Sequence, residues 1–460
     1  MNNAQKITHV LDRLSLGPRP GDRTQVERLG IDRYIQTQLN PQANNLPNNL
    51  KSDLRSFSTI NLSPIELHAQ YGPPPRNPST QQRQAAQQRQ RQVVQEALQT
   101  RIRKALENPN QLQEVMTDFW FNHFNVFINK GITRIWVGAY ERDAIRAHAL
   151  GKFRDLLGAT AKHPAMSMYL DNWRNTDPNS NRARGQYKGL NENYARELLE
   201  LHTLGVDGGY SQADVESLTR ILTGWSFVRN QDQGNHDGSG FRFEPARHDS
   251  SNKTLLGTSI PGDGIEEGER ALDLLAQHPS TARHISYKLA QYFVSDSPPE
   301  TIVNRLADRF LSSDGDIKEV LKTLFTDDTF WQDEYYQSKF KTPYQFILSM
   351  ARAVGLSSPE ENAVQRLLGA LNQLGMPLYR CSTPNGYAQI ESAWLNPDAL
   401  LRRVSFSRAV ANMSPDKPAA SELISTLGNQ FSTETLSVVN SARPQLQASL
   451  VLGSPEMMYR

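Results

Sequence analysis

Apolar residues recur at three- and four-residue spacing along most of the chain, and this spacing predicts α-helices. The segments with this pattern are Thr24 to Leu39, Gln84 to Ala105, Leu112 to Val126, Ile135 to Leu150, Asp214 to Leu222, Glu269 to Leu275, Thr281 to Phe293, Ile302 to Phe310, Ile317 to Leu324, Tyr344 to Val354 and Glu361 to Leu374. Strand-like patterning is confined to Phe241 to Gly262, where short apolar runs bounded by Asn, Gly and Pro predict a small β-hairpin. We therefore expect a mostly α fold.

Segments rich in Pro, Gly, Asn and Ser separate the predicted helices, but none of them marks a domain boundary. We expect one large helical unit over residues 1–460, with long surface loops at 72–80, 175–190 and 228–264. Loops of this length in a helical protein often form the rims of functional sites. The loops at 175–190 and 228–264 are the stronger candidates because they flank the densest cluster of acids.

The composition is that of a folded protein, with 38% hydrophobic and 21% charged residues. Fifty Lys and Arg against 48 Asp and Glu leave a net charge of +2, so no global field would recruit nucleic acid. The single cysteine, Cys381, excludes an internal disulfide and a zinc–thiolate cluster. The sequence as given carries neither an export signal nor a membrane span, which predicts a cytoplasmic protein and leaves an exported mature form open.

The segment Gln81 to Lys104 is rich in Gln and Arg and allows two interpretations. Five arginines could form a polyanion-binding stripe, namely Arg83, Arg89, Arg91, Arg101 and Arg103. The near-neutral total charge and the lack of interleaved aromatic residues favour a long solvated helix instead, and we expect no nucleic acid. In that interpretation the inward-facing residues are Val93, Val94, Leu98 and Ile102.

The densest acid and base chemistry lies in NENYARELLELHT, Asn191 to Thr203. At α-helical spacing one face of this segment carries Glu192, Asn193, Arg196, Glu197, Glu200 and Thr203. Arg196 lies four residues from Glu192 and from Glu200 and can bridge them, whereas Glu197 lacks such a partner. A buried Glu197 would therefore have a raised pKa and suit general acid or base catalysis. His202 falls on the apolar side, as a core histidine would, and the alternative for the whole face is a set of weak exposed ion pairs.

A second polar cluster lies in MTDFWFNHFNVF, Met116 to Phe127, where Asp118, Asn122 and Asn125 form a stripe among aromatic residues. So many aromatic residues predict burial, and buried polar groups need partners. Arg196 or the glutamate face could supply them, which would create an internal polar site between two helices.

The sequence does not decide whether two of the histidines have structural or functional roles. His123 fits a core position and a site position equally, and His248 lies in ARHDS, where metal binding or acid–base chemistry competes with an ordinary turn. A Walker loop, a dinucleotide-binding glycine pattern, HExxH and a nucleophile elbow are all absent from the sequence. The commonest nucleotide-binding, zinc-protease and serine-hydrolase classes are therefore excluded.

A series of motifs runs in order along the chain: HVLDRLSLGPRPGD, MTDFWFNHFNVF, NENYARELLELHTLGVDGGYSQADV, GWSF, RHD, KFKTPYQF, TPNGY, AWLNP and LGSPE. This series resembles the bacterial family catalogued as domain of unknown function eighteen hundred, over nearly the whole chain. Many members of that family resemble exported proteins, whereas this chain starts directly at the first motif. The resemblance implies no particular reaction.

The residues themselves suggest a hydrolase-like enzyme with a carboxylate-centred site between the Asp118 and Glu197 helices, near His248. The expected roles are catalysis for Glu197, Glu200 and His248, substrate binding for Arg196, Asn193 and Asn122, and coordination of a divalent metal ion, if one is used, for Asp118, His123 and Glu192. The substrate, whether a small molecule or a polymer, and the oligomeric state stay open. The alternative is a non-catalytic binding or assembly protein whose polar stripes form a structural ion-pair network.

Overall fold

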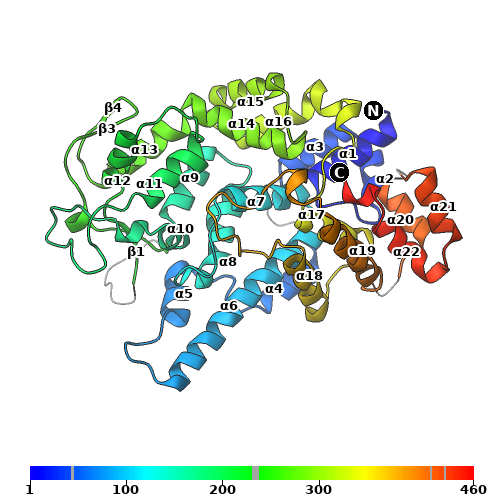
Figure 1. The fold of residues 1–460 in the computed structure, drawn as a ribbon, viewed down its shortest axis with the longest axis horizontal. Coiled ribbons are helices and arrows are strands. Elements are labelled where there is room, and N and C mark those ends of the chain that lie inside the picture. The colour runs from blue at the N-terminus through cyan, green and yellow to red at the C-terminus, as the bar shows by residue number, and fades with distance from the viewer. Residues whose placement is uncertain (43–45, 230–237, 415–416, 429–430) are drawn as a thin grey trace.

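The computed structural model describes residues 1–42, 46–229, 238–414, 417–428 and 431–460 (Figure 1). Within these residues the chain forms twenty-two α-helices and two small two-stranded sheets. The mostly α fold predicted from the hydrophobic spacing is therefore confirmed.

The first ten helices come before residue 170 and include the longest one, α6. They are α1 (Asn3–Leu14), α2 (Asp22–Leu29), α3 (Ile31–Leu39), α4 (Asn48–Arg55), α5 (Pro64–Tyr71), α6 (Thr80–Glu107), α7 (Gln111–His123), α8 (Val137–Ala139), α9 (Phe153–Lys162) and α10 (Pro164–Tyr169).

The other twelve helices come after residue 190. They are α11 (Asn193–Glu197), α12 (Gln212–Ile221), α13 (Ile265–Ala276), α14 (Pro279–Phe293), α15 (Glu300–Ser312), α16 (Ile317–Thr326), α17 (Pro343–Ala353), α18 (Glu361–Gln373), α19 (Pro397–Ala411), α20 (Ala420–Leu427), α21 (Thr433–Ser441) and α22 (Pro444–Leu452).

Local backbone chemistry explains where several predicted helices begin and end. Gly30, with φ of +82°, divides the predicted Thr24 to Leu39 helix into α2 and α3. Ser79 and Gln82 form a capping box that starts α6 earlier than the hydrophobic pattern indicates. Ser211 and Asp214 form a capping box that starts α12 two residues before the predicted start at Asp214.

Two predicted helical segments contain π-helical turns. The segment predicted from Ile135 to Leu150 consists of η1 (Thr133–Ile135), α8, the π-helix η2 (Tyr140–Ile145) and η3 (Arg146–His148). The segment after α11 is the π-helix η5 (Leu198–Thr203), in which the Leu204 amide donates to the Leu199 carbonyl. π-Helical turns are rare in proteins, and many of those that occur lie at functional sites.

The strands form two hairpins instead of the single one predicted. β2 (Phe241–Phe243) pairs with β1 (Trp225–Phe227), which precedes the predicted region, and β3 (Lys253–Leu255) pairs with β4 (Thr258–Ile260). Residues 230–237 of the predicted 228–264 loop lie outside the described residues.

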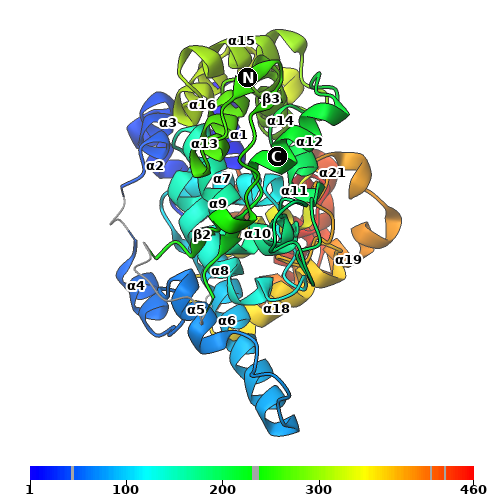
Figure 2. The ribbon, with the colours of Figure 1, turned by 90° about the vertical axis from the view of Figure 1, so that its left-hand side faces the viewer.

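The helices are arranged around α7, with α14, α15 and α16 on one side, α6 on another, and α19 to α22 at the end of the molecule that holds both termini (Figure 1). The first turns of α6 project from the rest of the protein (Figure 2). Buried apolar residues from Ile7 to Met458 join one contiguous cluster, and the organisation as a single unit stays a prediction.

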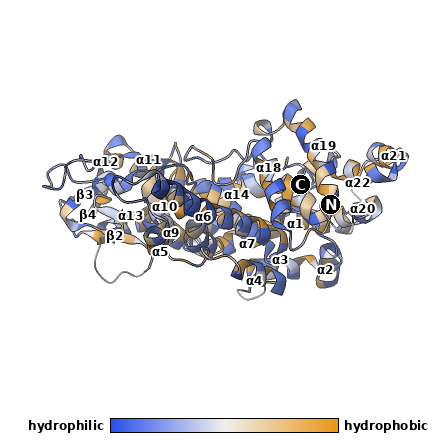
Figure 3. Ribbon diagram, turned by 90° about the horizontal axis from the view of Figure 1, so that it is seen from below, coloured by the Kyte–Doolittle hydropathy of each residue, from blue (hydrophilic) through white to orange (hydrophobic). Residues whose placement is uncertain are grey.

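Most helices carry hydrophilic and hydrophobic residues together, as expected for helices with one buried face (Figure 3). None of the described helices combines the length and the apolar character that crossing a membrane requires.

Candidate functional site

The start of the predicted acidic face lies at the protein surface. Arg196 donates from Nη2 to Glu192 Oε2 at 2.9 Å, and these two side chains are 41% and 40% exposed. Gln212 of α12 also accepts from the Arg196 guanidinium, and Asn193 is exposed in the first turn of α11. This part of the face therefore matches the alternative of solvated ion pairs.

The two glutamates that follow are partly buried. Glu200 accepts a hydrogen bond from the Tyr210 hydroxyl at 3.2 Å instead of pairing with Arg196, whose guanidinium contacts Glu192 and Gln212. Among the described residues Glu197 has no hydrogen-bond or ion-pair partner. Burial raises the pKa of Glu197, the neighbouring Glu200 raises it further, and Arg196 opposes both. A raised pKa is what the sequence suggests for a buried Glu197.

The polar stripe of α7 finds its partners far along the chain. Asn122 donates to the Tyr387 carbonyl at 2.8 Å and accepts from the Tyr387 amide at 2.7 Å. Asn125 donates to the carbonyl oxygens of Cys381 and Thr383 at 3.0 and 2.8 Å. The stripe therefore holds the TPNGY segment against the end of α7, and the Asn122 amide is committed to that contact.

Asp118 has a different partner from the one expected. Its carboxylate pairs with Arg101 of α6, while Arg196 stays at the surface with Glu192. Arg101 lies seventeen positions before Asp118, and both side chains are almost fully buried. The polar contact on this part of α7 is therefore made to α6 and not to α11.

The pair of Arg101 and Asp118 belongs to a larger buried cluster, which we call the Arg101 network. Its members are Arg101, Glu114, Asp118, Glu141 and Arg146. Glu141 accepts from Arg101 at 2.9 Å, from Arg146 at 3.0 Å and from the Tyr379 hydroxyl at 2.8 Å. Burial would raise the pKa of Glu141, but Arg101 and Arg146 hold it below its ordinary value. Burial dominates for Asp118, whose pKa is raised.

His123 lies among other buried bases. Its Nε2 is 3.1 Å from the His202 carbonyl oxygen, and its ring centre lies 6.1 Å from that of His202 and 6.2 Å from that of His284. Burial lowers the pKa of His123 and lowers that of His202 to about 3. His202 is thus a core histidine, as the helical spacing predicts. In the described ranges, no group of three or more His, Cys, Asp or Glu side chains is arranged to hold a metal ion.

His248 belongs to a closed cluster of its own. Its Nε2 lies 2.8 Å from Glu267 Oε1 and its Nδ1 lies 2.9 Å from the Thr223 carbonyl, while Lys253 donates to Glu267 at 2.6 Å. The His248, Lys253 and Glu267 side chains are at most 2% exposed. A site that unites Asp118, Glu197 and His248 stays a prediction.

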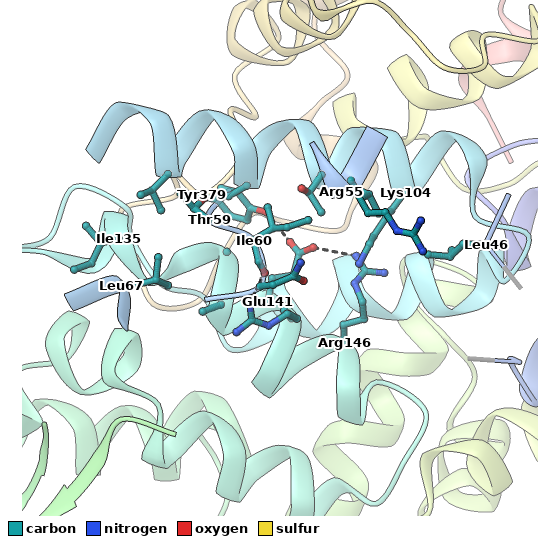
Figure 4. A pocket seen from close by; sticks show the side chains of 18 of the residues that line it. Leu46, Arg55, Thr59, Ile60, Leu67, Lys104, Ile135, Glu141, Arg146 and Tyr379 are labelled. Carbon is teal, nitrogen blue, oxygen red and sulfur yellow. Dashed lines mark hydrogen bonds and ion pairs between the residues drawn. The ribbon is translucent and has the colours of Figure 1, made fainter. Parts of the chain in front are cut away.

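A pocket of about 310 Å³ borders the Arg101 network (Figure 4). Its walls come from α4, α5, α6 and the chain from η1 to η3, together with Tyr379. The ionisable side chains that line it, apart from Tyr379, are Lys51, Arg55, Lys104, Glu141, Arg142 and Arg146. Basic groups therefore outnumber the single carboxylate, which is already hydrogen-bonded to Arg101, Arg146 and Tyr379.

Lys104 is the exceptional side chain in this pocket. In the part of the chain that the structure describes, its ammonium has no hydrogen-bond or ion-pair partner. Burial lowers the pKa of Lys104 to about 8, Arg146 and Arg142 lower it as well, and Glu114 and Glu141 act in the opposite direction. The surroundings of this ammonium therefore lack a counter-charge in direct contact.

This pocket was not predicted from the sequence, because the solvated-helix interpretation gave Lys104 no role in a site. Val93 and Ile102 are buried as predicted, but Arg101 and Arg103 are buried too. The available signal was the spacing of Val93, Ala97, Thr100 and Lys104, which puts an apolar-to-basic stripe on one face of α6.

Comparison with known proteins gives one match. Neither a curated protein nor a solved structure matches this chain. One family model matches residues 9–459, which is nearly the whole chain. The protein therefore belongs to the family described as protein of unknown function (DUF1800).

Proposed function

We propose that this protein binds a small anionic molecule in the pocket beside the Arg101 network. The observation that supports the proposal most strongly is Lys104, whose ammonium lines the pocket without a partner among the described residues. A cation in a partly desolvated pocket attracts an anion more strongly than the same cation in water. A bound carboxylate, phosphate or sulfate would supply the missing counter-charge.

Neighbouring groups strengthen this attraction. Arg55, in the last turn of α4, also lines the pocket and has an exposed side chain. Glu141 does not compete for Lys104 as a direct partner, because its oxygens are held by Arg101, Arg146 and Tyr379. The Arg101 network would act as the rigid scaffold of a binding protein, in line with the non-catalytic alternative.

Isothermal titration with phosphate, sulfate, acetate and butyrate tests this proposal. We expect at least one of these anions to bind, and we expect Lys104→Met to weaken that binding at least tenfold. Arg89→Met is the matched control, because Arg89 is an exposed cation on the same helix outside the pocket. Equal binding by the two variants, or no binding of any anion to the parent protein, would contradict the proposal.

A second candidate function is the hydrolase-like enzyme centred on Glu197. One observation favours it: a partly buried carboxyl with a raised pKa, next to Glu200, is suited to donate or accept a proton. Burial raises the pKa of Tyr169, as do Cys381 and Glu197, and the Tyr169 hydroxyl donates to the Ser382 carbonyl. Glu197 would be the acid or base and Glu200 its neighbouring carboxylate.

The test is hydrolysis of a panel of chromogenic esters, amides and phosphate esters, with and without added Mg²⁺, Mn²⁺ or Zn²⁺. The enzyme proposal predicts turnover that Glu197→Gln abolishes and that Glu192→Gln, at the exposed end of the same segment, leaves unchanged. Elemental analysis of the purified protein examines the metal part, and turnover that survives Glu197→Gln would exclude this role.

A further inference from the structure

The residues that line the pocket beside the Arg101 network change from apolar to basic along its length. One wall is the face of α6 that carries Val93, Ala97, Thr100 and Lys104, at successive spacings of four, three and four residues. At a rise of 1.5 Å per residue this stripe is about 16 Å long. It starts at an apolar side chain and ends at a cationic one.

The facing wall follows the same order. Ile135, Gly138 and Ala139 come first along the chain, and Arg142 and Arg146 follow within the π-helix and the turn after it. In Figure 4, Leu67 and Ile135 lie toward one end of the pocket, and Arg55, Lys104 and Arg146 lie toward the other, where Leu46 is the apolar neighbour. The pocket therefore has an apolar end and a basic end.

Close packing defines the apolar part. Gly138 approaches α6 so closely that a Cβ atom at this position would lie 2.9 Å from Ala97 Cβ. Val93 and Leu67 are 3% and 2% exposed. This packing leaves little room at the apolar end, so a ligand group that enters there has to be slender and apolar.

We propose that the ligand is an amphipathic monocarboxylate of medium length, with its carboxylate at Lys104 and Arg55 and its hydrocarbon chain along Val93 and Leu67. This inference rests on the proposed anion-binding function and specifies its ligand class. A compact ion such as phosphate would occupy the basic end alone and leave the apolar end without a partner. Each methylene buried at the apolar end should raise the affinity by up to about fourfold.

Isothermal titration at pH 7 with butyrate, octanoate, decanoate and octanol tests the proposal. We expect affinity to rise from butyrate to octanoate and decanoate, and octanol to bind at least tenfold more weakly than octanoate. Val93→Phe should fill the apolar end, removing the gain for octanoate and decanoate while leaving butyrate binding unchanged. Val94→Phe is the matched control, because Val94 is the next residue on α6 and does not line the pocket.

Folding of each variant is checked by its melting temperature, and Ile135→Phe on the facing wall provides a second test of the apolar end. If the carboxylates bind with equal affinity whatever their length, or if octanol equals octanoate, the ligand class is wrong while anion binding stands. If butyrate, octanoate, decanoate, phosphate and sulfate all fail to bind, both proposals fall.

Discussion

Arg101 and Lys104 lie three residues apart on one helix and have opposite surroundings. Arg101 contacts two carboxylates and three aromatic rings, those of Phe121, Tyr344 and Tyr379. Lys104 borders an open pocket and, in the described ranges, has no direct counter-charge. A buried cation whose donors are satisfied stabilises a fold, whereas a cation left unsatisfied at a cavity is better placed to hold a ligand.

The Arg101 network and the His248 cluster also differ in their access to a cavity. Both are sets of hydrogen-bonded charges, but Glu141 and Arg146 of the network line the pocket, whereas His248, Lys253 and Glu267 do not line it. The His248 cluster fastens the β3 region to α13 through Lys253 and Glu267. Polar residue types alone do not distinguish such structural clusters from a site; access to a cavity does.

The largest expected effect comes from breaking the Arg101 network. Arg101→Met removes the cation that pairs with Asp118 and one of the two cations that pair with Glu141, and loss of one partner of a buried ion pair costs about 3 to 5 kcal/mol. Lys104→Met should leave the free energy of unfolding unchanged or increase it, because a poorly compensated charge is removed. Urea denaturation of both variants measures this, and a loss for Lys104→Met as large as that for Arg101→Met would remove the contrast between the two residues.

A smaller effect is expected at His202, an unsatisfied base that faces the core instead of a cavity. Its Nε2 is buried without a partner in the described part of the chain, and the groups around it are His123, His284, Lys288, Tyr194 and Phe124. Because burial lowers its pKa to about 3, its contribution is complete above the unfolded pKa of about 6.5 and is lost as the pH falls toward 3.

The expected loss between pH 6.5 and pH 5 is about 1.6 kcal/mol from His202 alone. His202→Gln should reduce the acid-induced loss of unfolding free energy by that amount in urea titrations at the two pH values. His148→Gln is the control, because His148 is only partly buried. An unchanged pH dependence in His202→Gln would show that this histidine does not titrate as a core base.

The helices could be predicted from the sequence because a helix with one buried face has apolar residues at three- and four-residue spacing. The same logic placed His202 in the core, where it is buried. The π turn from Leu198 to Thr203 was not predictable from that spacing, and neither were the partners that Arg196 and Glu200 find in Gln212 and Tyr210.

The partners of the α7 stripe were beyond local reasoning. Asn122 and Asn125 are satisfied by backbone atoms of residues 381–387, more than 250 positions away. The pocket was missed for the same reason, because its walls come from four separate parts of the chain and only their packing creates a cavity. The local spacing of apolar residues predicts which face of a single helix is buried. The hydrogen-bond partners of buried polar side chains and the positions of cavities depend on tertiary contacts.

The pH dependence of anion binding sharpens the assignment of Lys104. With a pKa of about 8, its protonated fraction falls about tenfold between pH 7 and pH 9, so octanoate affinity should fall by the same factor, or about 1.4 kcal/mol. Lys104→Arg keeps the charge over this range and should flatten the dependence. Titrations at pH 7, 8 and 9 measure it, and a parent protein with constant affinity would show that the Lys104 ammonium does not hold the anion.

The smallest effect is expected at the exposed pair of Arg196 and Glu192. Exposed ion pairs four residues apart contribute roughly 0.5 kcal/mol or less, so Arg196→Gln should change the free energy of unfolding by no more than that. A high-salt measurement should give the same value for parent and variant, since salt screens the pair. A loss comparable to that of Arg101→Met would mean that this arginine has a buried role and that the contrast between exposed and buried arginines fails.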